Sequence, residues 1–178
     1  INVTAWPQPV LSLVSLNNET CNGFANGSVV VNTTGGSGNY TYGWNFNPTL
    51  NSSTASGLTG GSYSVTVTDA NLCIDSGTYT LTSPAPITIT PVAIDNASCF
   101  GYSDGGISVS ATGGTSPYNY RWETGTAGSS VSGLSAGSYS VTATDANNCS
   151  VSATFDVNEP APITVSSITY DSIRLGES

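Results

Sequence analysis

The sequence repeats itself, and this repetition constrains the fold more than any other feature. Four residues of the first half return 78 positions later, in these pairs: Cys21 and Cys99, Gly35 and Gly113, Tyr42 and Tyr120, Trp44 and Trp122. After the tryptophans the interval falls to 76 positions, in these pairs: Gly57 and Gly133, Tyr63 and Tyr139, Asp69 and Asp145, Cys73 and Cys149, Pro84 and Pro160. A unit of 76–78 residues therefore occurs twice, which predicts two parts of the same architecture.

The repeat also sets the predicted domain boundaries. A Pro-x-Pro element recurs at Pro7, Pro84 and Pro160. Proline lacks an N–H donor and restricts the backbone, so these elements suit short, stiff junctions. The predicted divisions are residues 1–7, the end of a preceding repeat; 8–84, repeat 1; 85–161, repeat 2; and 162–178, the start of a following module or a tail.

Within each repeat, apolar and polar residues alternate with a period of two. Tyr63, Val65 and Val67 fall on one face of a predicted strand, and the intervening serine and threonine residues fall on the other. Residues 139–143 and 151–157 alternate in the same way. This pattern is typical of half-buried antiparallel strands, and glycine-rich segments supply the turns between them. We predict an all-β chain with two tandem immunoglobulin-like antiparallel β-sandwich modules of about seven short strands each.

Two cysteines fall in each repeat, and four cysteines allow three disulfide pairings. Zinc binding is the alternative, but it requires clustered cysteines or histidines, and the chain has no histidine. A repeat of this size buries too little surface to be comfortably stable, so a covalent link within each repeat is physically motivated. We predict one intra-repeat disulfide per module, Cys21–Cys73 and Cys99–Cys149, and hence an oxidising, extracellular location.

The charge balance excludes several classes of function. The 178 residues include 11 acidic and only two basic side chains, giving a net charge of −9. This composition argues against partners that are nucleic acids or anionic membranes, and we expect no membrane insertion. Without histidine or lysine, the serines lack a general base, and the cysteines are expected to be oxidised. We therefore predict that the chain is not an enzyme.

The longest shared motif runs from Gly133-Leu134 through Tyr139-Ser140-Val141-Thr142 to Asp145-Ala146-Asn147-Asn148-Cys149, and residues 57–73 repeat it. A Gly-Gly pair followed by Tyr-x-Tyr-x-Trp precedes the motif in both copies. Over about residues 10–162 the chain resembles the SprB repeat, although Leu72 and Asn148 stand where that family often has glycine. The resemblance implies a large surface adhesin of gliding Bacteroidota, exported by type IX secretion to the bacterial cell surface, and it transfers no catalytic residue.

Tyr40 and Tyr118 belong to aromatic stripes with a spacing of two residues, which end at Trp44 and Trp122. Exposed aromatic rings stack on the apolar faces of sugars, so these two tyrosines are candidates for carbohydrate contact. The alternative is packing in the core, as for the strand-C tryptophan of immunoglobulin domains. Core packing is the preferred interpretation, more firmly for the tryptophans than for the tyrosines.

Oxygen ligands recur in one turn of each repeat, at Asp69 and Asn71 and again at Asp145 and Asn147. Calcium prefers six to eight oxygen ligands, so these four residues are the weak candidates for a calcium site, and no other cofactor is expected. The simpler alternative is that the aspartate and asparagine side chains bond to their own turn backbone.

The resemblance implies a non-catalytic repeat segment of a large cell-surface adhesin, which serves as filament or stalk and as surface contact in adhesion and gliding motility. Its expected partners are an extracellular surface or polysaccharide and neighbouring repeats of the same chain. Two alternatives remain open: an inert spacer, or a carbohydrate-binding accessory module of a secreted multidomain hydrolase.

Overall fold

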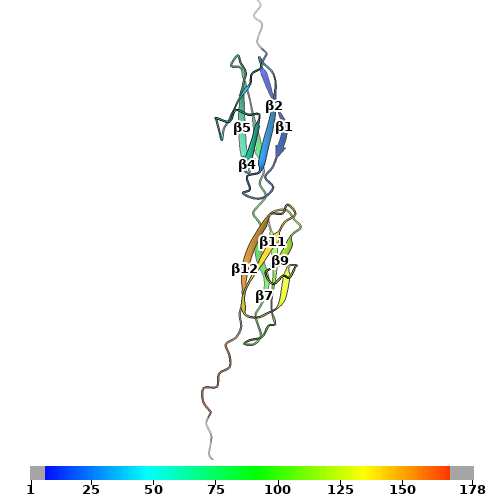
Figure 1. Ribbon diagram of the computed structural model, residues 1–178, viewed down its shortest axis with the longest axis vertical. Coiled ribbons are helices and arrows are strands. Elements are labelled where there is room, and N and C mark those ends of the chain that lie inside the picture. Colours follow the sequence, from blue (N-terminus) through cyan, green and yellow to red (C-terminus); the bar gives the residue numbers. More distant parts are fainter. Residues whose placement is uncertain (1–6, 169–178) are drawn as a thin grey trace, which may run out of the picture. The chain divides into compact units, whose positions relative to one another are not determined.

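The computed structural model describes residues 7–168, and all of the regular secondary structure in this range is β-strand (Figure 1). The first six strands are β1 (Pro9–Asn17), β2 (Gly27–Gly35), β3 (Thr41–Trp44), β4 (Thr54–Leu58), β5 (Gly61–Thr68) and β6 (Ile74–Leu81). The next six are β7 (Thr88–Asp95), β8 (Gly105–Thr112), β9 (Asn119–Trp122), β10 (Ser130–Leu134), β11 (Gly137–Thr144) and β12 (Ser150–Val157). Parts of the predicted terminal divisions, residues 1–6 and 169–178, lie outside the described residues.

The strands form four three-stranded sheets, in the orders β1-β2-β4, β3-β5-β6, β10-β8-β7 and β12-β11-β9. The ladders β1–β2, β2–β4, β3–β5, β5–β6 and β8–β10 are antiparallel. The prediction of an all-β antiparallel chain is therefore confirmed. Each sequence repeat contributes six of the described strands, where the sequence had suggested about seven.

The chain divides into two compact units. Unit 1 consists of residues 1–89, 111–120 and 142–152, and unit 2 consists of residues 90–110, 121–141 and 153–178. Unit 1 thus combines the first sequence repeat with two segments of the second repeat. The predicted module boundary between residues 84 and 85 stays a prediction.

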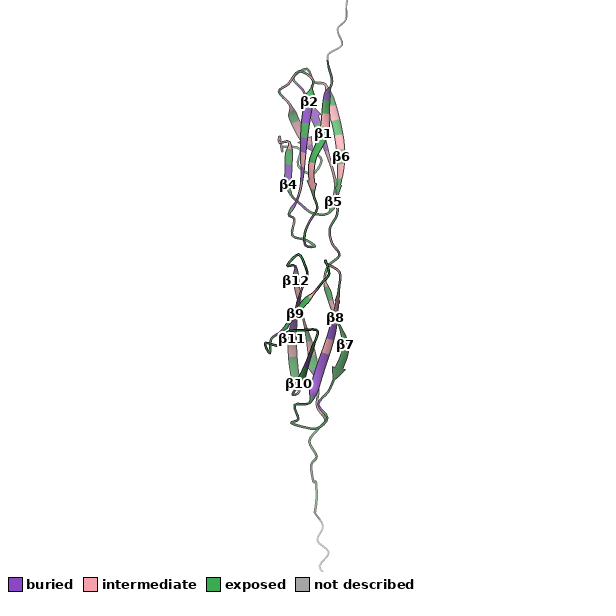
Figure 2. Cartoon of the chain, turned by 90° about the vertical axis from the view of Figure 1, so that its right-hand side faces the viewer, coloured by how far each residue is buried: buried purple, intermediate pink, exposed green. Residues whose placement is uncertain are grey.

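The core of the first repeat forms where the apolar faces of its strands meet. Its buried members are Val29, Val31, Trp44, Ala55, Leu58, Val65 and Leu81. On β2 these side chains alternate with more exposed ones, as the period-two pattern predicts (Figure 2). Trp44 is 1% exposed, and its indole N–H donates to the carbonyl oxygen of Ser52 at 2.9 Å. The prediction that the tryptophans pack in the core is confirmed, because Trp122 is equally buried.

Tyr63 and Tyr139 link the start of a strand to the turn before it. The hydroxyl of Tyr63 donates to the carbonyl oxygen of Thr59 at 2.9 Å. The hydroxyl of Tyr139 donates to Ser135 in the same way at 3.0 Å. Both bonds reach four residues upstream, as in the tyrosine corner of β-sandwich proteins.

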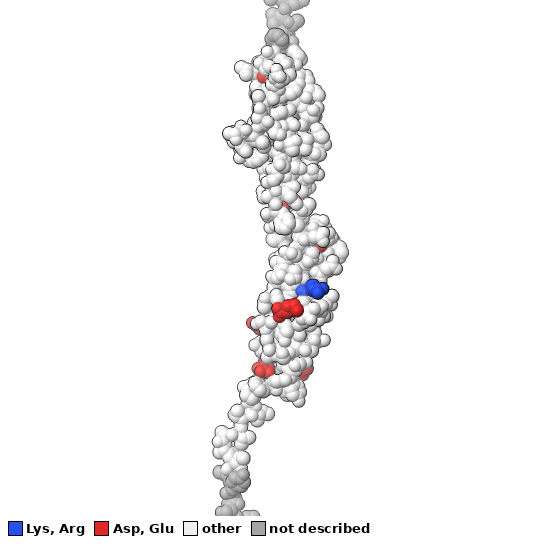
Figure 3. All heavy atoms as spheres, viewed as in Figure 1, with Lys and Arg blue, Asp and Glu red and all other residues white. Residues whose placement is uncertain are grey.

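Few charged side chains interrupt the surface on the face that Figure 3 displays. Arg121 on β9 is the basic residue within residues 7–168. Among these residues there is also no helix of the length and apolarity that crossing a bilayer requires.

Candidate functional site

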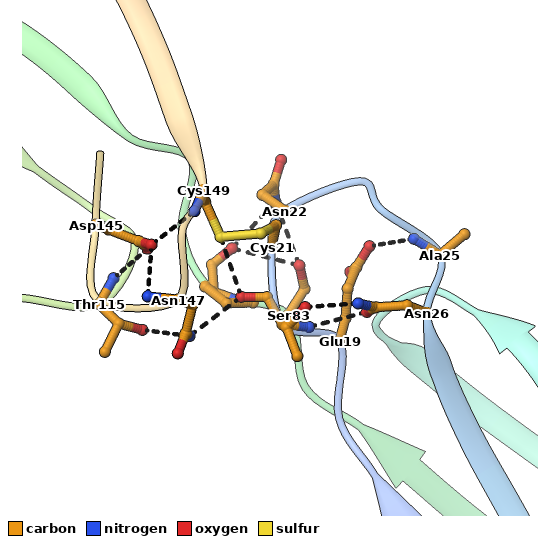
Figure 4. The surroundings of a disulfide bond; sticks show 12 residues. Glu19, Cys21, Asn22, Ala25, Asn26, Ser83, Thr115, Asp145, Asn147 and Cys149 are labelled. Carbon is orange, nitrogen blue, oxygen red and sulfur yellow. Dashed lines mark hydrogen bonds between the residues drawn. A yellow bond between two sulfur atoms is a disulfide. The ribbon is translucent and has the colours of Figure 1, made fainter. Parts of the chain in front are cut away.

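A disulfide bond joins Cys21 to Cys149 across 128 positions of sequence (Figure 4). The Cα atoms of the two cysteines are 5.6 Å apart, within the usual range for such a bond. Cys21 follows β1 and belongs to the first sequence repeat, and Cys149 precedes β12 and belongs to the second. Both cysteines lie within unit 1. The bond therefore joins the two repeats covalently at a point other than the chain that connects them.

The predicted pairings Cys21–Cys73 and Cys99–Cys149 are wrong, and strand geometry explains the error. Glu19, two residues before Cys21, donates its backbone N–H to Thr82. The eight-residue β6 separates Thr82 from Cys73, which corresponds to about 26 Å of extended chain. A disulfide tolerates Cα atoms no more than about 7 Å apart. The same argument excludes Cys99–Cys149. The backbone N–H of Ala97, two residues before Cys99, donates to the carbonyl oxygen of Asn158, and the eight-residue β12 separates Asn158 from Cys149.

The segment that carries Cys21 is held by side chains around it. The amide of Asn22 donates to the hydroxyl of Ser83 at 3.3 Å and to the carbonyl oxygen of Pro84 at 3.1 Å. The buried carboxylate of Glu19 accepts the backbone N–H of Ala25 at 2.9 Å and that of Gly60 at 3.2 Å. The bond from Ala25 is the main reason that the pKa of Glu19 lies below its ordinary value. These bonds fix the loop that presents Cys21.

The segment that carries Cys149 is a turn organised by one carboxylate. One oxygen of Asp145 accepts the backbone N–H of Asn147 at 2.8 Å and that of Cys149 at 2.9 Å, and the other accepts Thr115 N–H at 2.8 Å. Asn148 adopts a positive φ of 63° in this turn. This left-handed conformation explains why glycine suits the position, and Leu72, with φ of 64°, repeats it.

The two segments also meet through polar contacts. The side-chain amide of Asn147 donates to the carbonyl oxygen of Thr20 at 3.3 Å and to the hydroxyl of Thr115 at 3.0 Å. Cys149 Sγ lies 3.4 Å from the same Thr20 oxygen. A disulfide sulfur carries no proton, so this second approach is a close contact and not a hydrogen bond. Asn147 therefore links the turn to the segment that carries Cys21.

Burial alone raises the pKa of Asp145, but the N–H bonds from Thr115, Cys149 and Asn147 outweigh it, and the pKa lies below its ordinary value. The pKa of Asp69 is lowered in the same way, by Ser37, Cys73 and Asn71.

These shifts predict a loss of stability in acid. The unfolded chain binds protons first as the pH falls, so stabilisation that is complete above about pH 4 declines below it. We expect the free energy of unfolding, measured in urea from neutral pH to about pH 3, to fall less steeply in Asp145→Asn than in the native chain. An equal acid slope in both proteins would show that Asp145 does not contribute.

Cys73 and Cys99 have no disulfide partner among the described residues, and Cys99 is exposed. The turn at Cys73 is nevertheless built like the bonded one. The carboxylate of Asp69 accepts the backbone N–H of Ser37 at 3.0 Å, and those of Asn71 and Cys73 at 2.9 Å.

The four calcium candidates, Asp69, Asn71, Asp145 and Asn147, thus lie in turns where the carboxylates already accept three backbone donors each. Within residues 7–168 no three acidic, histidine or cysteine side chains cluster as metal ligands.

The tyrosines considered for carbohydrate contact are half-buried. The hydroxyl of Tyr40 donates to the carbonyl oxygen of Gly35 at 2.5 Å, and Tyr118 bonds to Gly113 in the same manner. Neither residue is fully buried, and a role in sugar contact remains a prediction.

The bonds of the two aspartates to their own turn backbone are the simpler alternative that the sequence offered. Sequence reasoning missed the contact between Thr20 and Asn147 and the bonds that Ser37 and Thr115 donate to the two carboxylates. The available signal was the recurring Asp-Ala-Asn-x-Cys string, in which the aspartate precedes the cysteine by four residues.

Comparison with known proteins gives one family and several distant structures. No curated protein sequence matches the chain. The three N-terminal domains of the highly immunogenic outer capsid protein (Hoc) of bacteriophage RB49 share 16% identity with a TM-score of 0.48, and the match covers 84% of this chain and 59% of that one. A C-terminal 282-residue fragment of intimin, in complex with the intimin-binding domain of its translocated receptor, shares 13% identity with a TM-score of 0.44, covering 83% of this chain and 64% of that one.

The N-terminal eight immunoglobulin domains of Down syndrome cell adhesion molecule share 12% identity with a TM-score of 0.42, covering 88% of this chain and 25% of that one. The chain thus spans less than two thirds of each of these three structures. Structural similarity at this level gives no information about what the chain binds. The family model that describes the SprB repeat matches residues 13–49 and residues 92–127, one segment in each sequence repeat. The resemblance to the SprB repeat that the sequence indicated is therefore confirmed in these two segments.

Proposed function

We propose that this chain is a non-catalytic segment of a large bacterial cell-surface adhesin, exported by type IX secretion, which serves as filament or stalk and as surface contact in adhesion and gliding motility. The two SprB-repeat matches support the family context. The observation that carries the proposal is the Cys21–Cys149 bond, because it links successive repeats and not the strands of one repeat.

A stalk must transmit force without unfolding, and the disulfide suits that task. Tension applied between the two ends of the chain passes through the Cys21–Cys149 bond, so the residues between the cysteines are not stretched. Of the strands in residues 7–168, only β1 and β12 lie outside this covalent loop. The bond also supports an extracellular location, since disulfides persist in oxidising compartments.

The surface chemistry fits a structural segment better than an enzyme. The serine-rich and threonine-rich faces lack any histidine or lysine base. The one acidic pair shared by the repeats, Asp69 and Asp145, is engaged by backbone N–H groups. A low density of charge keeps the segment from binding strongly to charged partners.

The surface-contact part of the proposal predicts saturable binding of the chain to a polysaccharide on a glycan array. Replacing both Tyr40 and Tyr118 by alanine should abolish this binding, because these two half-buried rings are the proposed sugar contacts. Tyr102→Ala is the matched control, since Tyr102 is exposed and lies outside the stripes. Absence of binding to every glycan, or an equal loss in the control, would contradict surface contact and leave the stalk role to be judged by its mechanics.

A further inference from the structure

The two cysteines without partners are the counterparts of the two that are bonded. Cys99 lies 78 positions after Cys21, and Cys73 lies 76 positions before Cys149. The observed bond joins the first cysteine of one repeat to the second cysteine of the next repeat. The chain therefore retains one free cysteine of each kind: Cys99, of the type of Cys21, and Cys73, of the type of Cys149.

The free turn at Cys73 already has the geometry of the bonded turn. Asp69 receives the same three backbone hydrogen bonds as Asp145, from the turn and from the residue after the Gly-Gly pair. Ser37 and Asn71 stand at the positions of Thr115 and Asn147. The turn is thus formed before any partner binds, and it lacks only the sulfur to which its cysteine would bond.

The surface around Cys99 repeats the surface around Cys21. A hollow beside Cys99 is lined by Ser98, Phe100 and the segment 160–163, which is Pro-Ala-Pro-Ile. The equivalent hollow beside Cys21 is lined by residues 84–87, also Pro-Ala-Pro-Ile, and there the segment 149–151 and Gly114 line it as well. The Cys99 hollow has the same floor but lacks the second-repeat residues that line its counterpart.

Residues that line the hollow beside Cys99 are more exposed than their counterparts beside Cys21. This is the difference expected if the Cys21 hollow is covered by another segment and the Cys99 hollow is not. Ile87 is half-buried, and a Cβ built on Gly114 would lie 2.7 Å from its side chain, so the two residues are in close contact. Its counterpart Ile163 is 99% exposed, and the neighbouring Phe100 is 55% exposed. Cys21 is 4% exposed, whereas Cys99 is an exposed residue. Apolar surface of this kind marks an interaction site.

We propose that the hollow beside Cys99 is a docking site for the Asp-Ala-Asn-x-Cys turn of another SprB repeat, closed by a disulfide, and that the Cys73 turn of a second copy of this chain supplies that ligand. Bond formation converts two thiols into one disulfide with loss of two protons and two electrons. Oxidised glutathione accepts them by thiol–disulfide exchange and becomes two molecules of reduced glutathione. Copies then join head to tail through bonds of the Cys21–Cys149 kind.

The test mixes two variants, each of which retains one free cysteine. Cys73→Ser keeps the docking hollow, and Cys99→Ser keeps the turn. In a glutathione redox buffer we expect the mixture to give a disulfide-linked heterodimer, and each variant alone to stay monomeric. In urea the preference should vanish, and homodimers and heterodimers should form in a statistical ratio. Folded homodimers that form as readily as the heterodimer would overturn the proposal, because they would indicate oxidation without recognition.

A second variant separates docking from the reactivity of an exposed thiol. Asn71→Ala in the Cys99→Ser chain removes the amide that corresponds to Asn147, whose side chain bonds to Thr20 in the observed junction. Loss of one hydrogen bond should slow heterodimer formation about fivefold. Leu72→Asn is the matched control, since the second repeat carries asparagine at that turn position. Equal rates for Asn71→Ala and Leu72→Asn would contradict a docked turn.

Discussion

A chain in which Cys149 is replaced by serine should extend about 450 Å further than the native chain when both are stretched from their two ends. The reason is the length of sequence that the bond encloses. The two cysteines are 128 positions apart, and each residue adds at most about 3.6 Å to an extended chain. In the native protein the disulfide prevents the residues between Cys21 and Cys149 from being extended, even after β1 and β12 detach.

Single-molecule force spectroscopy measures this difference directly. Cys73→Ser is the matched control, because it removes a cysteine that has no partner within the described residues. The Cys149→Ser chain should also lose about 5 kcal/mol in its free energy of unfolding, by the chain-entropy model for a loop of this length. An unchanged extension in Cys149→Ser, or a lengthening in Cys73→Ser, would contradict the pairing and the proposed mechanical role with it.

Replacing Trp44 by alanine should lower the free energy of unfolding by about 4 kcal/mol. The side chain is 1% exposed and lies among the buried valines and leucines of the first repeat. Truncation leaves a cavity the size of an indole ring and removes the donor to the Ser52 carbonyl oxygen. Urea denaturation at constant pH, followed by circular dichroism, gives the difference between variant and native chain.

Phe46→Ala is the control for this variant. Its ring packs against Trp44 with a centroid distance of 6.1 Å, but the side chain is 44% exposed. We expect it to cost less than about 1.5 kcal/mol, since little buried area is lost. A Trp44→Ala chain no less stable than Phe46→Ala would mean that the tryptophan does not anchor the core.

The strands could be predicted from the sequence because their periodicity is a local property. In β5, Val65 and Val67 are buried and Thr66 between them is exposed, as the alternation predicts. The burial of Trp44 follows from the same parity. None of these features requires knowledge of which strands pair.

The disulfide could not be predicted in this way, because it depends on strand direction and pairing. β2 pairs with β4 in one sheet, whereas β3 pairs with β5 in the other. These pairings decide at which end of the strands Cys21 and Cys73 lie, and periodicity carries no information about them. Proximity in sequence then favoured the intra-repeat bond, although β6 is too long for it.

The Asp69 and Asp145 turns show the same limit on a smaller scale. Sequence spacing identified their oxygen atoms, and both a calcium site and a backbone-bonded turn fitted the pattern. The choice between these depends on the positions of Ser37 and Thr115, which lie about 30 residues away in sequence and donate to the two carboxylates.

The most direct test of the account is proteolysis of a chain that retains only Cys21 and Cys149. In the Cys73→Ser/Cys99→Ser variant, cleavage after Arg121 divides the polypeptide between the two remaining cysteines. Digestion under denaturing conditions without reductant should yield fragments that stay joined and separate when a reductant is added. In the matched Cys21→Ser/Cys99→Ser variant the fragments should separate at once. Immediate separation in the first variant would show that the bond between the repeats does not form.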